Sequence, residues 1–156
     1  MVLAFDIDAL ILDGNYGAVF LFFILYGWAI IPFSYALSFF FKVPGNSLLS
    51  SFFIHLVFGS IISIVIYVFF LIESTRDAAS YLVWIFRPIP SFSFSLGLLR
   101  TSLKQFFELI FENSITPPNT FAMRVAGEDL IVLTISGVAY MLIVFILEFF
   151  EDNGSL

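Results

Sequence analysis

This 156-residue chain is too apolar for a soluble domain, since 61% of its residues are hydrophobic, 20% are aromatic and only 12% are charged, with a mean hydropathy of +1.08. The absence of Cys excludes disulfides, Cys-ligated zinc and a cysteine nucleophile. A net charge of −6 with six scattered basic residues excludes a phosphate-binding patch for nucleic acid.

Two uncharged apolar runs, residues 14–41 and 43–72, are separated only by Lys42. Each run is longer than the ~20 residues that a helix needs to cross a bilayer, and charges at membrane depth cost roughly 2.5–3.5 kcal/mol each. The runs predict transmembrane helices over 14–41 and 49–72, joined by a tight turn. Pro32 should kink the first helix, because it removes a backbone hydrogen bond.

Small and polar residues recur at helical spacing on both runs. They are Gly27, Ser34 and Ser38 on the first, and His55, Gly59, Ser63 and Tyr67 on the second. Such stripes predict faces on which neighbouring helices approach closely. Since three spans form a thin bundle, we expect the partners of these faces to lie outside this chain.

The next segment is interrupted by charges and prolines. Its uncharged pieces, residues 78–86 and 88–99, contain nine and twelve residues, about 13 and 18 Å of helix, which is too short to cross a core of ~30 Å. We therefore predict a re-entrant helical hairpin over 78–104, with its bend at Arg87, Pro88 and Pro90. Arg100, Lys104 and Glu108 at steps of four suggest that it continues as an interfacial helix.

A third uncharged run, residues 130–147, has acidic residues on both sides. Its eighteen apolar residues predict a transmembrane helix over 128–149, which reaches both interfaces through its flanks. Pro117 and Pro118 indicate an irregular loop over 105–127 before this helix. Residues 150–156 remain as a tail.

Isolated polar residues leave alternatives open. His55 could relay protons, or be a neutral histidine that is hydrogen-bonded across a helix interface, which we favour. Arg87 could meet a lipid phosphate or extend to headgroup level without specific recognition. Glu108 and Glu112 have the spacing of paired carboxylates, although a solvated helix face is commoner. No catalytic, cofactor-binding or metal-ligating set is predicted.

Three stretches resemble, in the same order and spacing, motifs in the transmembrane domains of subfamily A ABC transporters, the large lipid exporters. Residues 25–44 are similar to Y-G-W-x-x-x-P-x-x-Y-x-x-S-F-x-F-x-x-P through Tyr26, Gly27, Trp28, Pro32, Tyr35, Ser38, Phe39, Phe41 and Pro44. Residues 86–98 are similar to F-x-x-x-P-x-F-x-L-G-x-G-L through Phe86, Pro90, Phe92, Gly97 and Leu98. Residues 125–138 are similar to V-G-x-N-L-x-x-M-x-x-x-G-V through Gly127, Leu130, Gly137 and Val138. Ser95 and Asp129 depart from these patterns, which have Gly and Asn there.

The resemblance implies that residues 1–150 are part of an ABC-exporter transmembrane domain, an all-α integral membrane fold with three transmembrane helices and a re-entrant hairpin. It implies that the turn between the first two spans faces the cytoplasm and rests on a nucleotide-binding domain. The coupling residues would be Phe41, Lys42, Val43, Pro44, Gly45, Asn46 and Ser47. The hairpin would lie in the outer leaflet, near where lipid is received, the loop 105–127 would be extracytoplasmic, and the tail 150–156 would be cytoplasmic.

The positive-inside rule prefers the opposite orientation. The segment 73–129 contains five basic residues, whereas the turn contains only Lys42. We keep the orientation that the resemblance implies, because upstream spans normally set the topology of a membrane protein.

The resemblance implies a permease that moves lipid or sterol. The chain contains no G-x-x-x-x-G-K-[ST] phosphate loop, so it is not expected to be an enzyme, and ATP and Mg²⁺ are expected only in a nucleotide-binding domain outside it. Expected partners are membrane lipids and the remaining helices and nucleotide-binding domains of a transporter, with no nucleic acid. The alternatives are a truncated, non-transporting membrane protein that pairs with or regulates a full-length transporter, and a stand-alone channel-like oligomer.

Overall fold

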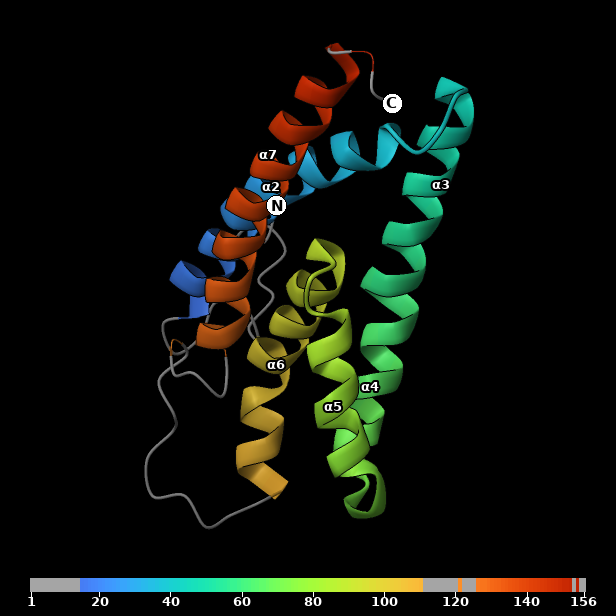
Figure 1. Ribbon diagram of the computed structural model, residues 1–156. Coiled ribbons are helices and arrows are strands. Elements are labelled where there is room, and N and C mark those ends of the chain that lie inside the picture. The colour runs from blue at the N-terminus through green and yellow to red at the C-terminus, as the bar shows by residue number, and fades with distance from the viewer. Residues whose placement is uncertain (1–14, 111–120, 122–125, 153, 155–156) are drawn as a thin grey trace.

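The computed structural model describes residues 15–110, 121, 126–152 and 154, most of which lie in helices (Figure 1). No strand occurs among these residues, and the predicted all-α class is confirmed. Three helical stretches are long and apolar enough to cross a membrane, Tyr16–Ser38, Gly45–Leu71 and Glu128–Asp152. They correspond to the three predicted spans.

The first span is helix α2 (Asn15–Ser38), which continues through Pro32. It ends three residues before the predicted boundary, because the chain tightens into a turn. Phe40 N–H donates to the Leu37 carbonyl at 3.1 Å, and Phe41 N–H donates to the Ser38 carbonyl at 3.1 Å. Val43 is then extended (φ −112°, ψ 120°), the conformation that a residue before proline prefers.

The second span is built from α3 (Pro44–Leu56), the π-helical segment η3 (Val57–Ile62) and α4 (Ser63–Leu71). It begins at Pro44, five residues before the predicted start. Proline suits the first helical position, since its φ is already helical and its missing N–H would have no helical partner there. The predicted turn over 41–47 is therefore wrong for its second half, because residues 44–47 form the first turn of α3.

The predicted hairpin consists of α5 (Arg76–Phe86) and α6 (Pro90–Ile110), preceded by the 3₁₀ turn η4 (Glu73–Thr75). Both helices are longer than predicted. Residues 105–110 continue α6 and are not a loop, because no Gly or Pro interrupts the chain between Gly97 and Ile110. The rest of the predicted loop up to residue 125, including Pro117 and Pro118, lies outside the described residues except for Phe121.

The third span, α7 (Glu128–Asp152), is also longer than predicted. Residues 150–152, which we assigned to the tail, extend the helix by most of a turn. The acidic residues Glu151 and Asp152 are therefore on the helix and not in the tail.

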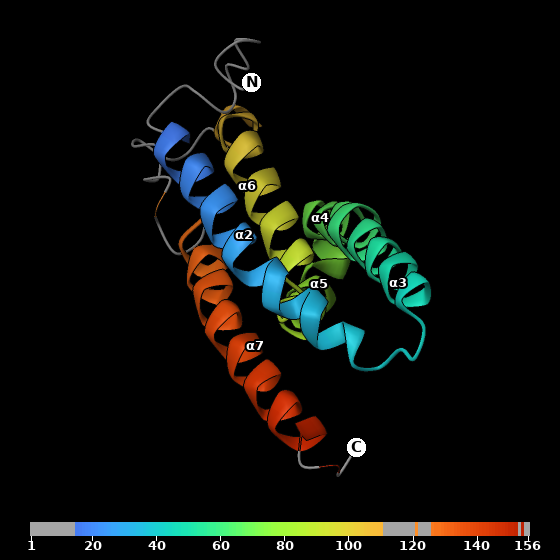
Figure 2. The same ribbon diagram turned by 90° about the horizontal axis from the view of Figure 1, so that it is seen from above.

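Helix α6 lies at the centre of the bundle, between α2 and α7 on one side and α4 and α5 on the other (Figures 1 and 2). Helices α2 and α7 run side by side in the same direction, since Trp28 lies over Gly137 and Tyr35 bonds to Glu148. The turn between α2 and α3 and the C-terminal end of α7 therefore lie at one end of the molecule, which we call the turn end.

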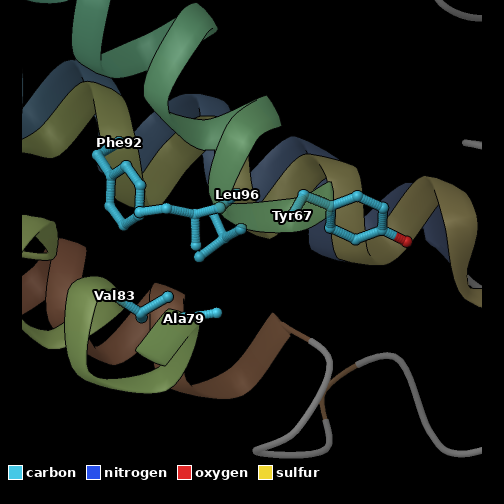
Figure 3. Packing of buried hydrophobic residues seen from close by; sticks show 6 residues of the cluster. Tyr67, Ala79, Val83, Phe92 and Leu96 are labelled. Atoms are coloured by element: carbon cyan, nitrogen blue, oxygen red, sulfur yellow. The ribbon is translucent and has the colours of Figure 1, made fainter. Parts of the chain in front are cut away.

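Two hydrophobic clusters hold α6 in place. One joins α4, α5 and α6 through Ile66, Tyr67, Ala79, Val83, Phe92 and Leu96 (Figure 3). The other joins α6 to α2 and α7, with Phe22, Ala29, Ala126, Leu130 and Leu133 packed against Leu25, Phe94 and Leu98. Helix α6 of the hairpin thus fills the interior of the bundle, whereas α5 lies outside it and exposes Tyr81, Trp84 and Ile85.

The small-residue stripes have different partners. The stripe on the second span packs against the chain's own α6, because a Cβ on Gly59 would be 3.1 Å from Ser91 Cβ, and Ser63 Oγ lies 3.5 Å from the Phe92 carbonyl. Our expectation that such faces need partners outside the chain was wrong for this stripe. On α2, Gly27 meets nothing within 4 Å among the described residues.

Candidate functional site

The hairpin bend is held by hydrogen bonds from outside the bend itself. The predicted bend residues Arg87, Pro88 and Pro90 lie at the junction of α5 and α6. Ser93 Oγ donates to the Arg87 carbonyl at 2.9 Å, and Tyr140 of α7 donates to the Pro88 carbonyl at 2.8 Å. Two backbone carbonyls at the bend, where the helical hydrogen-bond ladder is interrupted between α5 and α6, are thereby satisfied.

A buried ionic cluster lies beside this bend. The Arg87 side chain is only 3% exposed and pairs with both Glu128 and Asp129 at the start of α7, the latter at 3.5 Å. Asp129 is fully buried and also accepts a bond from Arg100 of α6 at 3.2 Å. Two cations therefore face two carboxylates, and their formal charges cancel.

Aromatic rings cover the cations of this cluster. The Arg87 guanidinium lies 4.5 Å from the centroid of Trp84, and that of Arg100 lies 5.5 Å from the centroid of Phe70. These distances are within the range of cation–π attraction, which strengthens where water is excluded. The cluster thus joins α4, α5, α6 and α7.

The ionic cluster corrects several predictions. Arg87 neither reaches for a lipid phosphate nor extends to the surface, because both of its acidic partners are within the fold. Arg100 is not on a solvated interfacial face, because it pairs with Asp129. We missed Arg100, Glu128 and Asp129 as site residues. The signal that could have indicated the pairing was the presence of two arginines in the hairpin and of two carboxylates just before the last apolar run.

The lone histidine links three helices. His55 Nε2 lies 3.2 Å from Ser34 Oγ of α2, and His55 Nδ1 is hydrogen-bonded to Ser91 Oγ of α6. Ser91 also lies within 3.4 Å of the Tyr26 hydroxyl. The favoured prediction, a histidine hydrogen-bonded across a helix interface, is confirmed.

At the turn end, a polar cleft of about 620 Å³ separates the end of α2 from the start of α3. Among its lining residues are Ser34, Ser38, Lys42, Ser47, Ser51 and His55. Of the predicted coupling residues, Phe41, Lys42 and Ser47 line this cleft, and Val43, Gly45 and Asn46 are exposed. Across α2, Tyr35 donates a hydrogen bond of 2.8 Å to Glu148 and so ties the ends of α2 and α7 together.

Within the described part of the chain, no three His, Asp or Glu side chains gather as a metal site. The side chain of Glu108 and all of Glu112 lie outside the described residues, as does the side chain of Lys104. The polar features of the described residues are the ion pairs beside the bend and the cleft at the turn end.

The comparison with known families decides the assignment. Residues 1–146 match the family of ABC-2 family transporter proteins. The chain belongs to this family. The ABC-2 assignment covers the first two spans, the hairpin and most of the third span. The predicted resemblance to ABC transporters is confirmed, and the chain is an integral membrane component of the ABC-2 type.

Known relatives of this ABC-2 chain are members of ABC subfamily A. It is 29% identical to the ATP-binding cassette sub-family A member 2 of Rattus norvegicus over 109 residues, which are 68% of this chain and 4% of that protein. It is 28% identical to the phospholipid-transporting ATPase ABCA7 of Homo sapiens over 152 residues, 94% of this chain and 7% of that protein. It is 27% identical to the retinal-specific phospholipid-transporting ATPase ABCA4 of Mus musculus over 129 residues, 80% of this chain and 6% of that protein.

The ABC-2 chain thus spans only 4–7% of the length of these relatives. Two of them are named phospholipid-transporting ATPases, whereas the matched region consists of membrane helices. The family membership therefore applies to the helices and the hairpin.

Proposed function

We propose that this chain is the membrane-spanning permease part of an ABC-type transporter and that it moves lipid or sterol across the bilayer. Two of its relatives are named phospholipid-transporting ATPases. A nucleotide-binding domain outside this chain would bind ATP and Mg²⁺ and supply the hydrolysis. The remaining transmembrane helices of the transporter would pack against the exposed apolar faces of the three spans.

One observation carries the proposal: α6 of the hairpin lies inside the bundle, and the hairpin is joined by ion pairs to α7, the span that ends at the turn end. Movement applied at the turn end can therefore reach the hairpin through rigid helices and a buried cluster. Packed elements with few alternative arrangements transmit displacement in this way.

We further propose a multi-pass topology in which the turn end faces the cytoplasm and the hairpin enters from the opposite side. The positive-inside rule opposed this orientation because of the basic residues in 73–129. Two of them, Arg87 and Arg100, are paired with the carboxylates of Glu128 and Asp129. They contribute little free positive charge to that segment, which weakens the objection.

Orientation is tested by adding a protease-sensitive tag after Leu156. We expect the tag to resist protease added to intact cells and to be cleaved once the membrane is permeabilised. A second tag inserted between Glu73 and Ser74, which are exposed at the opposite end of the second span, serves as the control and should show the reverse pattern. Cleavage of the C-terminal tag in intact cells would contradict the topology.

Coupling is tested by replacing Phe41 and Val43 with Gly, which keeps Lys42 and leaves the first turn of α3 intact. On the chain co-purified with its ATPase partner, we expect lipid-stimulated ATP turnover to fall at least about fivefold, the lower range of coupling between sites. The matched control replaces exposed Glu73 and Ser74 with Gly-Ser and should leave turnover unchanged.

Unchanged turnover in the turn variant would refute coupling through this turn. Co-purification with an intact full-length transporter, with no effect of the chain on lipid transport, would instead favour the second hypothesis, a truncated, non-transporting partner protein.

A further inference from the structure

The cleft at the turn end has a chemistry that is unusual for a membrane span. Four of its lining residues are serines, and Lys42 and His55 add a cation and an imidazole. No Asp or Glu is among the lining residues. Ser38 Oγ already donates to the Tyr35 carbonyl, and Ser34 Oγ is paired with His55. The ammonium of Lys42 and the hydroxyls of Ser47 and Ser51 are the other donors of the lining, and such a set suits an oxygen-rich anion.

One hydroxyl in the cleft lacks a partner. Ser51 Oγ is buried and makes no hydrogen bond to any described group. A buried hydroxyl without a partner is uncommon in folded proteins, because its lost hydration is not compensated. An oxygen of a bound ligand would supply the missing hydrogen bond.

The start of α3 strengthens the preference for an anion. Ser47 and Leu48 of its first turns line the cleft, and the cap residue Val43 offers no side-chain hydrogen bond to the helix. The N-terminus of a helix carries a partial positive charge and attracts anions. In Figure 2 the end of α2 lies between α3 and the C-terminal half of α7, so α2 separates the acidic end of α7 from the start of α3.

The surface beside the cleft is apolar. Leu48, Leu49 and Phe52 on α3 are 76%, 56% and 59% exposed. A lipid whose headgroup occupied the cleft could place its acyl chains along this face. A free anion would make no use of the face, so the pairing of a cationic cleft with an apolar wall favours a lipid.

We propose that the cleft between α2 and α3 binds the phosphate-bearing headgroup of an anionic membrane lipid. Lys42 pairs with the phosphate, and Ser47 and Ser51 donate hydrogen bonds to its oxygens. This site lies at the turn end, whereas the hairpin lies toward the other end of the bundle. It would make the helices beside the turn sensitive to the charge of the leaflet that surrounds them.

The test measures binding of short-chain lipids to the purified chain in a neutral detergent. The probes are dihexanoyl phosphatidate and dihexanoyl phosphatidylcholine, which share their acyl chains and differ in headgroup charge. We expect phosphatidate to bind about tenfold more tightly, the effect of one additional charge-assisted hydrogen bond. Lys42→Ala and Ser51→Ala should each reduce this ratio to below about three, and Lys42→Arg should retain most of it.

The matched control is Arg76→Ala, which removes an exposed cation at the opposite end of the second span. Its ratio should equal that of the wild-type chain. Equal affinity of the wild-type chain for both lipids, or an equal loss in Lys42→Ala and Arg76→Ala, would overturn the proposal. If an equal concentration of inorganic phosphate displaced phosphatidate, the ligand of the cleft would be a free anion, and the proposal of a lipid ligand would be overturned.

Because these measurements need neither ATP nor a partner, they are independent of the proposed transport function. A failure to bind lipid would leave the turnover and topology experiments unaffected. If the turnover and topology experiments failed instead, the measured ratio of phosphatidate to phosphatidylcholine affinity would still have to be explained by a binding site.

Discussion

The Asp129→Ala variant should unfold about 3–5 kcal/mol more easily than the wild-type chain, the usual cost of removing one partner from a buried ion pair. Asp129 is fully buried and contacts both Arg87 and Arg100. Its loss leaves Arg100 without a described carboxylate and Arg87 with only Glu128. The free energy of unfolding can be measured by denaturant titration in mixed micelles.

Two further variants separate charge from volume. Asp129→Asn keeps the size and one acceptor oxygen and should lie between alanine and the wild-type chain, although the resembled motif has Asn at this position. Asp77→Ala removes an exposed carboxylate from the first turn of α5, and its cost should stay below about 1 kcal/mol, the scale of a helix-end charge. A cost for Asp129→Ala no larger than that for Asp77→Ala would show that the cluster is not stabilising.

The Gly97→Ala variant should lose about 2 kcal/mol of stability, because one added methyl group overpacks the bundle interior. A Cβ at this position would lie 2.3 Å from Phe22 Cζ and 3.2 Å from Asp129 Cβ. Phe22 is fully buried, so its ring has little room to move aside. Thermal unfolding of the detergent-solubilised chain gives the measurement.

The chain supplies a matched control for Gly97 on α2. A Cβ on Gly27 would meet nothing within 4 Å, so Gly27→Ala should be neutral or slightly stabilising. Gly137 is an intermediate case, since its Cβ would meet the Trp28 ring at 2.1 Å, but Trp28 is 46% exposed and can move. Equal stability of the Gly97 and Gly27 variants would contradict the close packing of α6 against α2.

The spans could be predicted because each depends on local composition. An uncharged apolar run of sufficient length has no other stable place than the bilayer, whatever its partners are. The hairpin followed from equally local features, since its pieces are short and Pro88 and Pro90 separate them. The start of the second span was predicted five residues too late, because a proline fits both a turn and the first position of a helix.

The ionic cluster could not be predicted from such patterns, because its pairs are distant in the sequence. Arg87 and Glu128 are 41 residues apart, and Arg100 and Asp129 are 29 residues apart. Which charge meets which depends on how deeply the hairpin enters the bundle, and that depth is set by the packing of α6. The cleft could not be predicted either, because its serines belong to two helices, and the sequence pattern does not give the angle at which these helices diverge from the turn.

The π-helical segment η3 has a rotational consequence for the second span. On a regular α-helix, each step of four residues turns about 40° past a full circle, so His55 and Tyr67 would point about 120° apart. A hydrogen bond in a π-helix spans five residues instead of four, so η3 contains one extra residue, which compensates for this rotation. Both side chains can then face α6. Deleting one residue from η3 would rotate α3 by about 100° around the helix axis relative to α4. The direction in which the cleft-lining side chains of α3 point therefore depends on one extra residue in the middle of the second span.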